Sequence, residues 1–284
     1  MQSDQSCFSV PNLVPLTQYI PSIAYIQIQP ITQPYPYQMP SPRIIDLGHL
    51  PYADAYALQL AHHEEVLAAR DSGNPDPGRI LLVEHDPPVI TISRRAGARD
   101  HLTATPDQLT HAGVEVAQTD RGGDITYHGP GQLVVYPILD LNYYHLGLHA
   151  YMRLMEQAII DTIAHWGITG ERDPTATGVW VLPHSPLPTP HCPPCKIAAL
   201  GVRVRRWVSM HGLALNVTTN LDHFNLIVPC GLAGRGVTTL ERELGSLCPS
   251  MIDVKRELTS RLTTRLQEAA QFARENTQHP GVRS

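Results

Sequence analysis

The chain has no long hydrophobic run and no excess of positive charge, and each absence excludes a class of protein. None of its apolar stretches, in 284 residues, reaches the length of a membrane-spanning helix, which requires roughly 20 consecutive apolar residues. Its formal net charge of -5 argues against non-specific nucleic-acid binding, because that task needs positive charge to neutralise phosphates. We therefore expect neither a membrane protein nor a nucleic-acid-binding protein.

The chain also has few cysteines and no recognisable secretory signal. The five cysteines are an odd, sparse set, so a disulfide framework is not expected and a reduced compartment is. The N-terminus lacks the basic region and compact apolar core of a secretory signal. Charged residues make up 17% and hydrophobic residues 42%, as in ordinary globular enzymes. The sequence predicts a cytoplasmic globular protein.

The first 42 residues are rich in Pro, Gln, Ser and Tyr, and Asp4 is their only charged residue. Such a segment cannot bury enough apolar surface to offset its ordering entropy. We expect residues 1–42 to be a disordered extension, with a short docking strand as the alternative. Residues 43–275 are expected to form a single domain, and 276–284 a loose tail.

Hydrophobic periodicity in this domain predicts a mixture of strands and helices. Helices are expected at 52–70, 105–113, 149–167 and 251–271, with another starting at Thr238 or Thr239. Strands are expected at 43–48, 79–85, 89–93, 114–119, 132–141, 178–182 and 226–229, with a hairpin over 196–218 that turns near Arg205. Because consecutive strands often lack an intervening helix, the expected fold class is α/β or α+β, with a mostly antiparallel mixed sheet flanked by helices.

The densest chemical signal is RGGDITYHGPGQ at 121–132, between two predicted strands. Glycines permit positive φ and let a ligand approach the backbone closely. The segment lacks the G-K-[ST] ending of a phosphate-binding P-loop. It is either a plain glycine- and proline-rich hairpin loop or a ligand-binding loop.

A cysteine in a Pro-Cys-Gly turn is the second candidate. Cys230 follows the apolar run 226–229; most unpaired cysteines are simply buried apolar side chains. To act as a nucleophile it needs a base or a cation nearby. The candidates for that neighbour are Lys196, His128 and His211.

Two strand segments complete the set. Lys196 precedes four apolar residues; it is either an edge lysine that reaches solvent or a partly desolvated base with a lowered pKa. In MHGLALNV, strand alternation places Gly212 and Ala214 opposite His211 and Leu213. The small pair would leave room for a bulky ligand, although an ordinary core strand has the same pattern.

Together, RGGDITYHGPGQLVVYPILDL, KIAALGVRVRRWVSMHGLALNV and the Pro-Cys-Gly-Leu segment closely resemble the octanoyltransferases of lipoate biosynthesis, the lipoyl(octanoyl) transferases. EHDPPVITISRR resembles the early strand pair of that family, and the similarity spans roughly residues 43 to 260. The resemblance implies the fold of lipoate and biotin protein ligases. It also implies an acyltransferase that moves octanoyl from acyl carrier protein to a lysine of a lipoyl domain.

Residue roles carried over by motif are implied by the same resemblance. Cys230 matches the cysteine that forms the acyl-thioester, and Lys196 matches the lysine that lowers the pKa of the thiol and shuttles a proton. The substrate-binding residues would be Arg121, Gly122, Gly123, Asp124, Ile125, Thr126, Tyr127, His128, Ala199, Leu200, Gly201, Gly212, Leu213 and Ala214. No metal and no cofactor are expected.

The implied partners are octanoyl-acyl carrier protein as donor, with lipoyl domains of 2-oxoacid dehydrogenases and the glycine cleavage H protein as acceptors. The carrier is acidic, so Arg203, Arg205 and Arg206 are candidate docking residues, or else a solvated hairpin tip. An ATP-dependent lipoate ligase of the same fold is the alternative, although adenylation needs no nucleophilic cysteine. An acyl thioesterase is a second alternative.

One segment departs from the family pattern. Residues 183–195 form a proline-rich insertion that contains the C-x-x-C pair Cys192 and Cys195, with His184 and His191 nearby. Zinc sites usually have a second cysteine or histidine pair at regular spacing. A zinc or redox module centred on this pair is therefore the non-enzymatic alternative, and an inserted loop without chemistry is the favoured interpretation.

Overall fold

A computed structural model describes residues 40–182, 193–228 and 235–278, and its central element is a seven-stranded sheet. The strand order is β1-β2-β6-β10-β9-β8-β7. Only β1 and β2 pair in parallel, and every other neighbouring pair is antiparallel, as expected from the sequence. The strands are β1 (Arg43–Leu50), β2 (Arg79–His85), β6 (Gln132–Ile138), β7 (Gly170–Glu171), β8 (Val179–Val181), β9 (Cys195–Arg205) and β10 (Val208–Asn216).

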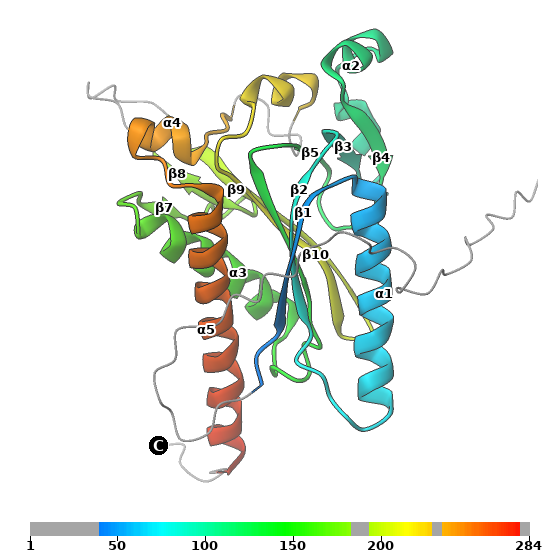
Figure 1. Cartoon of the computed structure of the whole chain (residues 1–284), viewed down its shortest axis with the longest axis vertical. Helices are drawn as coiled ribbons and strands as arrows, with labels where there is room; N and C mark the ends of the chain where they lie inside the picture. Colours follow the sequence, from blue (N-terminus) through cyan, green and yellow to red (C-terminus); the bar gives the residue numbers. More distant parts are fainter. Residues whose placement is uncertain (1–39, 183–192, 229–234, 279–284) are drawn as a thin grey trace, which may run out of the picture.

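Helices cover both faces of this sheet (Figure 1). On one face lies α1 (Tyr52–Asp71), whose Ala55, Val66 and Leu67 pack against β2, β6 and β10. On the other lie α3 (Leu148–Ala164) and α5 (Met251–Gln278). The chain therefore folds as three layers, helix, sheet and helices.

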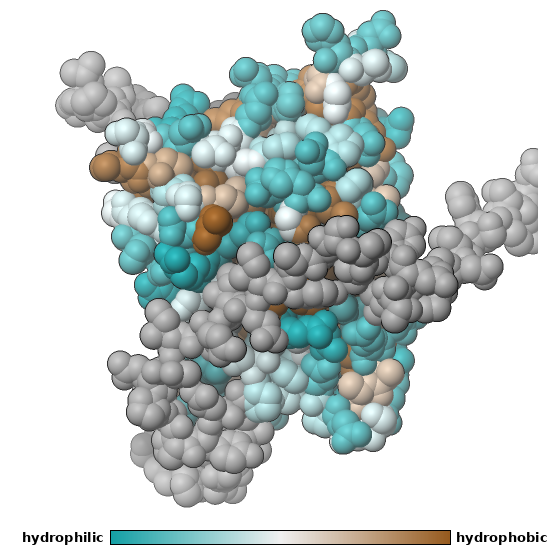
Figure 2. All heavy atoms as spheres, in the orientation of Figure 1, coloured by the Kyte–Doolittle hydropathy of each residue, from teal (hydrophilic) through white to brown (hydrophobic). Residues whose placement is uncertain are grey.

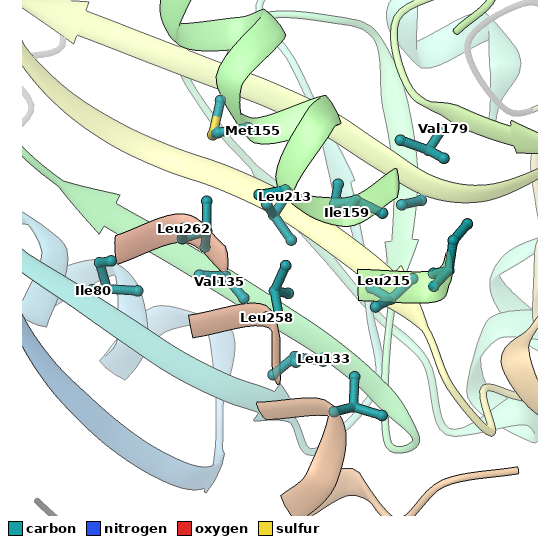
Figure 3. Packing of buried hydrophobic residues seen from close by; sticks show 14 of the residues in the cluster. Ile80, Leu133, Val135, Met155, Ile159, Val179, Leu213, Leu215, Leu258 and Leu262 are labelled. Atoms are coloured by element: carbon teal, nitrogen blue, oxygen red, sulfur yellow. The ribbon is translucent and has the colours of Figure 1, made fainter. Parts of the chain in front are cut away.

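The larger core fills the space between the sheet and the pair α3 and α5. Figure 3 shows Ile159 of α3 and Leu258 of α5 beside Leu213 of β10. Along β6, successive side chains face opposite cores: Val135 lies in this core, and Tyr136 lies in the core under α1. Strand pleating accounts for the alternation.

A three-stranded sheet of order β4-β3-β5 packs beside the start of α1. Its strands are β3 (Val89–Ile92), β4 (Glu115–Gln118) and β5 (Ile125–His128). The segment 121–132 is therefore not one continuous loop, because its middle residues ITYH form β5 and pair with β3. Three of those four residues are β-branched or aromatic, which favours a strand.

The predicted helix caps are present in the structure. Thr105 caps α2 (Pro106–Ala112) in a capping box with Gln108, and Gly113 ends it in the left-handed conformation, as the sequence pattern predicts. Thr239 caps α4 (Leu240–Leu244). The described residues complete the fold with η2 (Ala98–His101), η3 (Leu221–Leu226) and η5 (Gly245–Leu247).

Two local predictions are wrong, one strand and one helix end. The strand expected at 226–229 is absent from its described part, where Leu226 ends η3 and Ile227 makes only an isolated bridge to Leu102. Helix α5 continues past the expected end to Gln278, because no glycine or proline interrupts it before that residue.

The hairpin of β9 and β10 turns at Arg206 and Trp207, close to the predicted position. Both residues have positive φ, 51° and 65°, as a two-residue hairpin turn requires. On the face in Figure 2, apolar side chains form separate patches among hydrophilic ones. None of the described helices is long and apolar enough to cross a membrane.

Candidate functional site

A pocket opens between the seven-stranded sheet and the small sheet, beside Tyr52 at the start of α1. Every predicted substrate-binding residue except Gly122 and Tyr127 lines it. The segment 121–128 is far in the sequence from the other two motifs, which β9 and β10 pair directly, with Gly201 opposite Gly212. The fold thus gathers the candidate binding segments into one cavity.

Tyr127 faces away from this pocket. Its ring is buried in a separate core against Phe224, and its hydroxyl lies 2.8 Å from Nδ1 of His223. Gly122 instead places its backbone on β9, donating from its N–H to the carbonyl of Val202 at 2.9 Å. These two residues therefore act in the scaffold of the pocket.

The strand glycines serve close backbone packing. A Cβ on Gly201 would lie 2.7 Å from the carbonyl oxygen of Gly122, and one on Gly212 would lie 2.2 Å from that of Val135. The expectation that Gly212 leaves room for a ligand is thus wrong, because the backbone of β6 fills that space. Ala199 and Ala214 remain as the small side chains of the pocket wall.

The Gly212→Ala substitution should therefore destabilise the protein by about 1–3 kcal/mol, the usual cost of overpacking. Urea unfolding measures the change. The matched control is Gly147→Ala, where a Cβ would have no atom within 4 Å and the expected loss is under about 1 kcal/mol. Equal stability of Gly212→Ala and the unmodified chain would contradict the packing of β10 on β6.

His211 breaks the alternation of β10. It has a φ of 57°, in the left-handed region that residues other than glycine rarely adopt. Its ring stacks on Tyr56 of α1, and its Nε2 lies 2.8 Å from Oδ1 of Asp120. His211 therefore lies on the α1 side of the sheet, whereas Leu213 points into the α3 and α5 core; the predicted shared face is wrong.

Asp120 organises this corner of the pocket. Burial raises its pKa, but hydrogen bonds from His211 and Tyr56 and the charge of Arg203 outweigh that effect and bring the pKa to about 2. Nearby, Arg121 is anchored on Thr91, with Nη2 donating to the carbonyl of Thr91 at 2.8 Å. The beginning of the RGGDITYHGPGQ segment is thus fixed to the small sheet.

Two buried histidines, His128 in the pocket wall and His85 behind it, stay neutral. Burial lowers the pKa of His85 to about 4 and that of His128 well below its ordinary value. Burial also raises the pKa of Tyr136 well above its ordinary value. These three side chains therefore carry no charge at neutral pH.

Lys196 lies on the same sheet but does not line the pocket. Its side chain is 8% exposed, and its Nζ lies 4.7 Å from the centroid of the Trp180 ring. The register between β8 and β9 shifts next to Lys196, which pairs with Trp180, and such a bulge interrupts the strict alternation of side chains. Lys196 is therefore withdrawn from solvent.

Cys230 lies outside the described residues, as do residues 231–234, and the description resumes at Arg235. The N–H of Lys196 donates to the carbonyl of Gly236 at 2.9 Å, and the N–H of Thr238 donates to the carbonyl of Lys196 at 3.0 Å. Arg235 stacks on the same Trp180 ring at 3.8 Å from its centroid. Residues soon after Cys230 in the sequence therefore run alongside Lys196.

The arginines proposed for carrier docking all have acidic partners within the chain. Arg203 pairs with Asp120, Arg205 with Glu64 at 3.8 Å, and Arg206 with Asp71 at 2.8 Å. The positive charges of these three arginines, at and near the hairpin tip, are therefore already paired with acidic side chains of the same chain.

Of the proline-rich insertion, only the last residues, including Cys195, are described. Cys192, His184 and His191 lie outside the described residues, so only Cys195 of the proposed zinc or redox pair is described. The Sγ atom of Cys195 approaches the backbone of Gly236, where a Cβ would lie 2.8 Å from it. The insertion therefore joins β9 right beside the strand position of Lys196.

Several residues of the pocket have no signal in the sequence patterns. These are Tyr52, Thr91, Val134 and Tyr136, and His85 stands directly behind Tyr136, 2.7 Å from its hydroxyl. They come from α1, β3, β6 and β2, so only the tertiary fold brings them together. A polar aromatic residue inside an apolar strand, as in LVVYPI, is the one local sign that could have found Tyr136.

Comparison with known proteins identifies the family of the chain. A family model, the lipoyl protein ligase A/B catalytic domain, matches residues 55–263. The octanoyltransferase of Bacteroides thetaiotaomicron is 42% identical over 228 residues, which cover 80% of this chain and 96% of the relative. The octanoyltransferase of Parabacteroides distasonis is 43% identical over 207 residues, covering 73% and 90%.

Solved structures agree at the level of the fold. The bipartite lipoate protein ligase of Thermoplasma acidophilum superposes with a TM-score of 0.57 at 17% identity, over 84% of this chain and 92% of that one. A lipoate-protein ligase A bound with ATP gives a TM-score of 0.57 at 17% identity, over 84% and 95%. Given the sequence relatives and the shared fold, the chain belongs to the octanoyltransferase family, and it is an acyltransferase.

Proposed function

We propose that the protein transfers an octanoyl group from octanoyl-acyl carrier protein to a lysine of a lipoyl domain, through a thioester on Cys230. The observation that carries the proposal is the placement of Lys196. Its side chain is buried against Trp180, and its backbone is hydrogen-bonded to Gly236 and Thr238, a few residues after Cys230. The described residues that follow the candidate nucleophile in the sequence thus lie beside this basic side chain, which supports the pairing of Lys196 with Cys230.

The reaction would proceed in two halves. The Cys230 thiolate attacks the carbonyl carbon of the donor thioester, and the carrier's thiol leaves with a proton supplied through Lys196. The lysine amine of the lipoyl domain then attacks the Cys230 thioester, forming an amide. The sulfur of Cys230 departs, and the amine loses its extra proton to Lys196. Splitting acyl transfer in this way replaces one difficult step with two easier ones.

The pocket suits the acyl chain and its carbonyl end. Ala199, Ala214, Ile125 and Val134 supply apolar surface, which favours burial of methylene groups by about 0.8 kcal/mol each. Arg121, Thr126 and His128 add polar side chains to the same lining. We therefore place octanoyl along the alanine-lined wall.

A lipoyl domain as the acceptor is supported by a similar structure. The structure of the Thermoplasma ligase belongs to an archaeal lipoylation system that includes an E2 lipoyl domain. We extend that acceptor class to this chain, so that its product, an octanoylated lipoyl domain, would be the precursor of the lipoate cofactor in the first step of its endogenous synthesis. The lipoyl domains of 2-oxoacid dehydrogenases and the glycine cleavage H protein are the proposed acceptors.

The choice of donor distinguishes this function from ATP-dependent ligation and from hydrolysis. The protein is incubated with an apo lipoyl domain and either octanoyl-carrier protein, or octanoate with ATP and Mg²⁺, and the mass of the domain is followed. We expect an octanoylated domain from the carrier thioester without ATP. Product only from octanoate and ATP would make the protein a ligase, and release of free octanoate without modified domain would make it a thioesterase.

Docking of the acidic carrier is better served by a second arginine cluster. Arg94, Arg95 and Arg99 are exposed and form no ion pair with any residue in the described ranges. They follow Ser93, whose hydroxyl donates to the carbonyl of the pocket residue Gly123 at 3.0 Å. Positive charge that has no acidic partner among the described residues therefore lies beside the pocket, just after β3.

Replacing Arg94, Arg95 and Arg99 by alanine together should raise KM for octanoyl-carrier protein about tenfold or more, because charged docking patches act on association. The kinetics of transfer from octanoyl-pantetheine, which lacks the acidic protein, are the control and should not change. An equal effect on both donors, or none on the carrier, would contradict docking at this surface.

A further inference from the structure

Two series of hydrogen bonds run behind the pocket, and these two chains end at Tyr136 and His128. The first chain starts at the backbone carbonyl of Leu50. Nδ1 of His85 lies 3.1 Å from that oxygen, and a carbonyl oxygen only accepts, so Nδ1 carries the proton. His85 is neutral, because burial lowers its pKa to about 4. Its Nε2 is therefore an acceptor, and the Tyr136 hydroxyl, 2.7 Å away, must donate to it.

The second chain starts at the backbone carbonyl of Thr238. Asn216 donates to it from Nδ2 at 3.0 Å, so the oxygen of the Asn216 amide faces Gln132. Gln132 donates from Nε2 to that oxygen at 2.9 Å and to the carbonyl of Tyr127 at 3.2 Å. Its own oxygen, 2.7 Å from Nδ1 of His128, can only accept. His128 therefore carries its proton on Nδ1.

Both chains end at the pocket on atoms that can only accept. His128 and Tyr136 line the pocket. Because Nδ1 of neutral His128 holds the proton, its Nε2 offers a lone pair, and no described residue donates to it. The Tyr136 proton points at His85, so its oxygen likewise offers lone pairs. The backbone carbonyls at the start of each chain fix this polarity, since a reversed chain would bring two acceptors together.

We propose that the pocket wall formed by His128 and Tyr136 is the subsite for the amine of the incoming lysine. The inference rests on the proposed function and deepens it by assigning the acceptor's position. A carbonyl oxygen or a carboxylate at this wall would meet only lone pairs. The N–H groups of an amine pair with both acceptors, and the nitrogen lone pair stays free to attack the acyl carbon.

The pantetheine arm of the carrier also has N–H donors, in its two amides, and could occupy the same wall. Kinetics distinguish pantetheine from the acceptor lysine. Pantetheine acts in the formation of the acyl-enzyme, and the lysine acts only in the transfer from it. Loss of an acceptor that binds the lysine must therefore slow the second half-reaction selectively.

The test is the Tyr136→Phe variant, which removes the acceptor oxygen and keeps the ring. Acyl-enzyme formation from octanoyl-carrier protein and its decay on adding a lipoyl domain are each followed by intact mass. We expect the decay to slow by about 10- to 100-fold, the effect of one hydrogen bond to a charged or polarised group, with formation close to the rate of the unmodified protein.

The matched control is Tyr144→Phe. Tyr144 is also buried, but its hydroxyl donates to the carbonyl of Pro77 at 2.8 Å and it does not line the pocket. Neither half-reaction should change in this variant. A thermal melt of both variants shows whether Tyr136→Phe is folded.

Gln132→Met gives an independent reading if Tyr136→Phe does not fold. Gln132 is a positioning residue, because it holds the His128 tautomer without reaching the pocket wall itself. Its loss should also slow the second half-reaction and spare the first. Equal slowing of both halves, or unchanged transfer, would overturn the lysine subsite. An unmodified protein that forms no acyl-enzyme at all would overturn the proposed function and this inference with it.

Discussion

Replacing Cys230 by alanine should abolish octanoyl transfer, with a loss of at least about a thousand-fold, as expected when the nucleophile of a covalent mechanism is removed. Without the sulfur there is no thioester, and the lysine of the lipoyl domain would have to attack the carrier thioester directly. The rate of appearance of the octanoylated lipoyl domain, followed by mass, measures the effect.

Cys248 provides the matched control for this substitution. It is a partly buried cysteine near α5 whose Sγ lies 3.6 Å from the carbonyl of Pro249. Burial, and then the charge of Glu241, raise the pKa of its thiol, so it is not a reactive thiolate at neutral pH. Cys248→Ala should transfer octanoyl at the normal rate. A Cys230→Ala variant as active as Cys248→Ala would rule out the covalent route.

The second large effect is expected for Lys196→Ala, which should slow acyl-enzyme formation at pH 7 by about 10²- to 10⁴-fold, the usual contribution of a general base. A cysteine thiol with an ordinary pKa of about 8.5 is only a few per cent thiolate at pH 7. Raising the pH deprotonates the thiol without help, so the rate of the variant should partly recover toward pH 9. A pH–rate profile of acyl-enzyme formation, measured on both proteins, provides the comparison.

Lys196→Arg separates the charge of the side chain from its proton transfer. Arginine keeps a cation against the Trp180 ring but does not give up its proton. Acyl-enzyme formation should therefore suffer less than transfer to the lipoyl domain, where the attacking amine must lose a proton. A Lys196→Ala profile parallel to that of the unmodified protein at every pH would contradict a role for Lys196 in proton transfer.

Local signals in the sequence predict the elements whose stability is local. The capping box of Thr105 and the left-handed Gly113 delimit α2 as their residue types indicate. The turn at Arg206 and Trp207 falls where two alternating apolar stretches meet. In these cases the neighbouring residues supply the caps and the pairing, so a short window of sequence contains the cause.

The departures arise from contacts between distant segments. The φ of His211 is held from outside its strand, by the amide oxygen of Gln59, which accepts from its N–H at 2.8 Å, and by Asp120 on its ring. The alternation rule cannot anticipate either contact. Likewise Gly212 matches the pattern of a ligand-facing glycine, but the carbonyl of Val135 occupies the space.

The sequence motifs predict which segments of the chain line the candidate site. The glycine-rich segment and the two strands converge on one pocket as the family resemblance implies. The direction of the hydrogen bonds behind His128 and Tyr136 depends on the backbone carbonyls of Leu50 and Thr238. The sequence does not reveal which backbone carbonyls lie behind these side chains. That the wall offers only hydrogen-bond acceptors is therefore seen only in the fold.

The covalent intermediate is the central claim, and the intact mass of the protein after mixing with octanoyl-carrier protein tests it most directly. We predict one octanoyl adduct, absent from Cys230→Ala, which disappears when an apo lipoyl domain is added while the domain gains the same mass. Octanoylation of the lipoyl domain without any adduct on the protein at any time point, even on rapid quenching, would contradict the account.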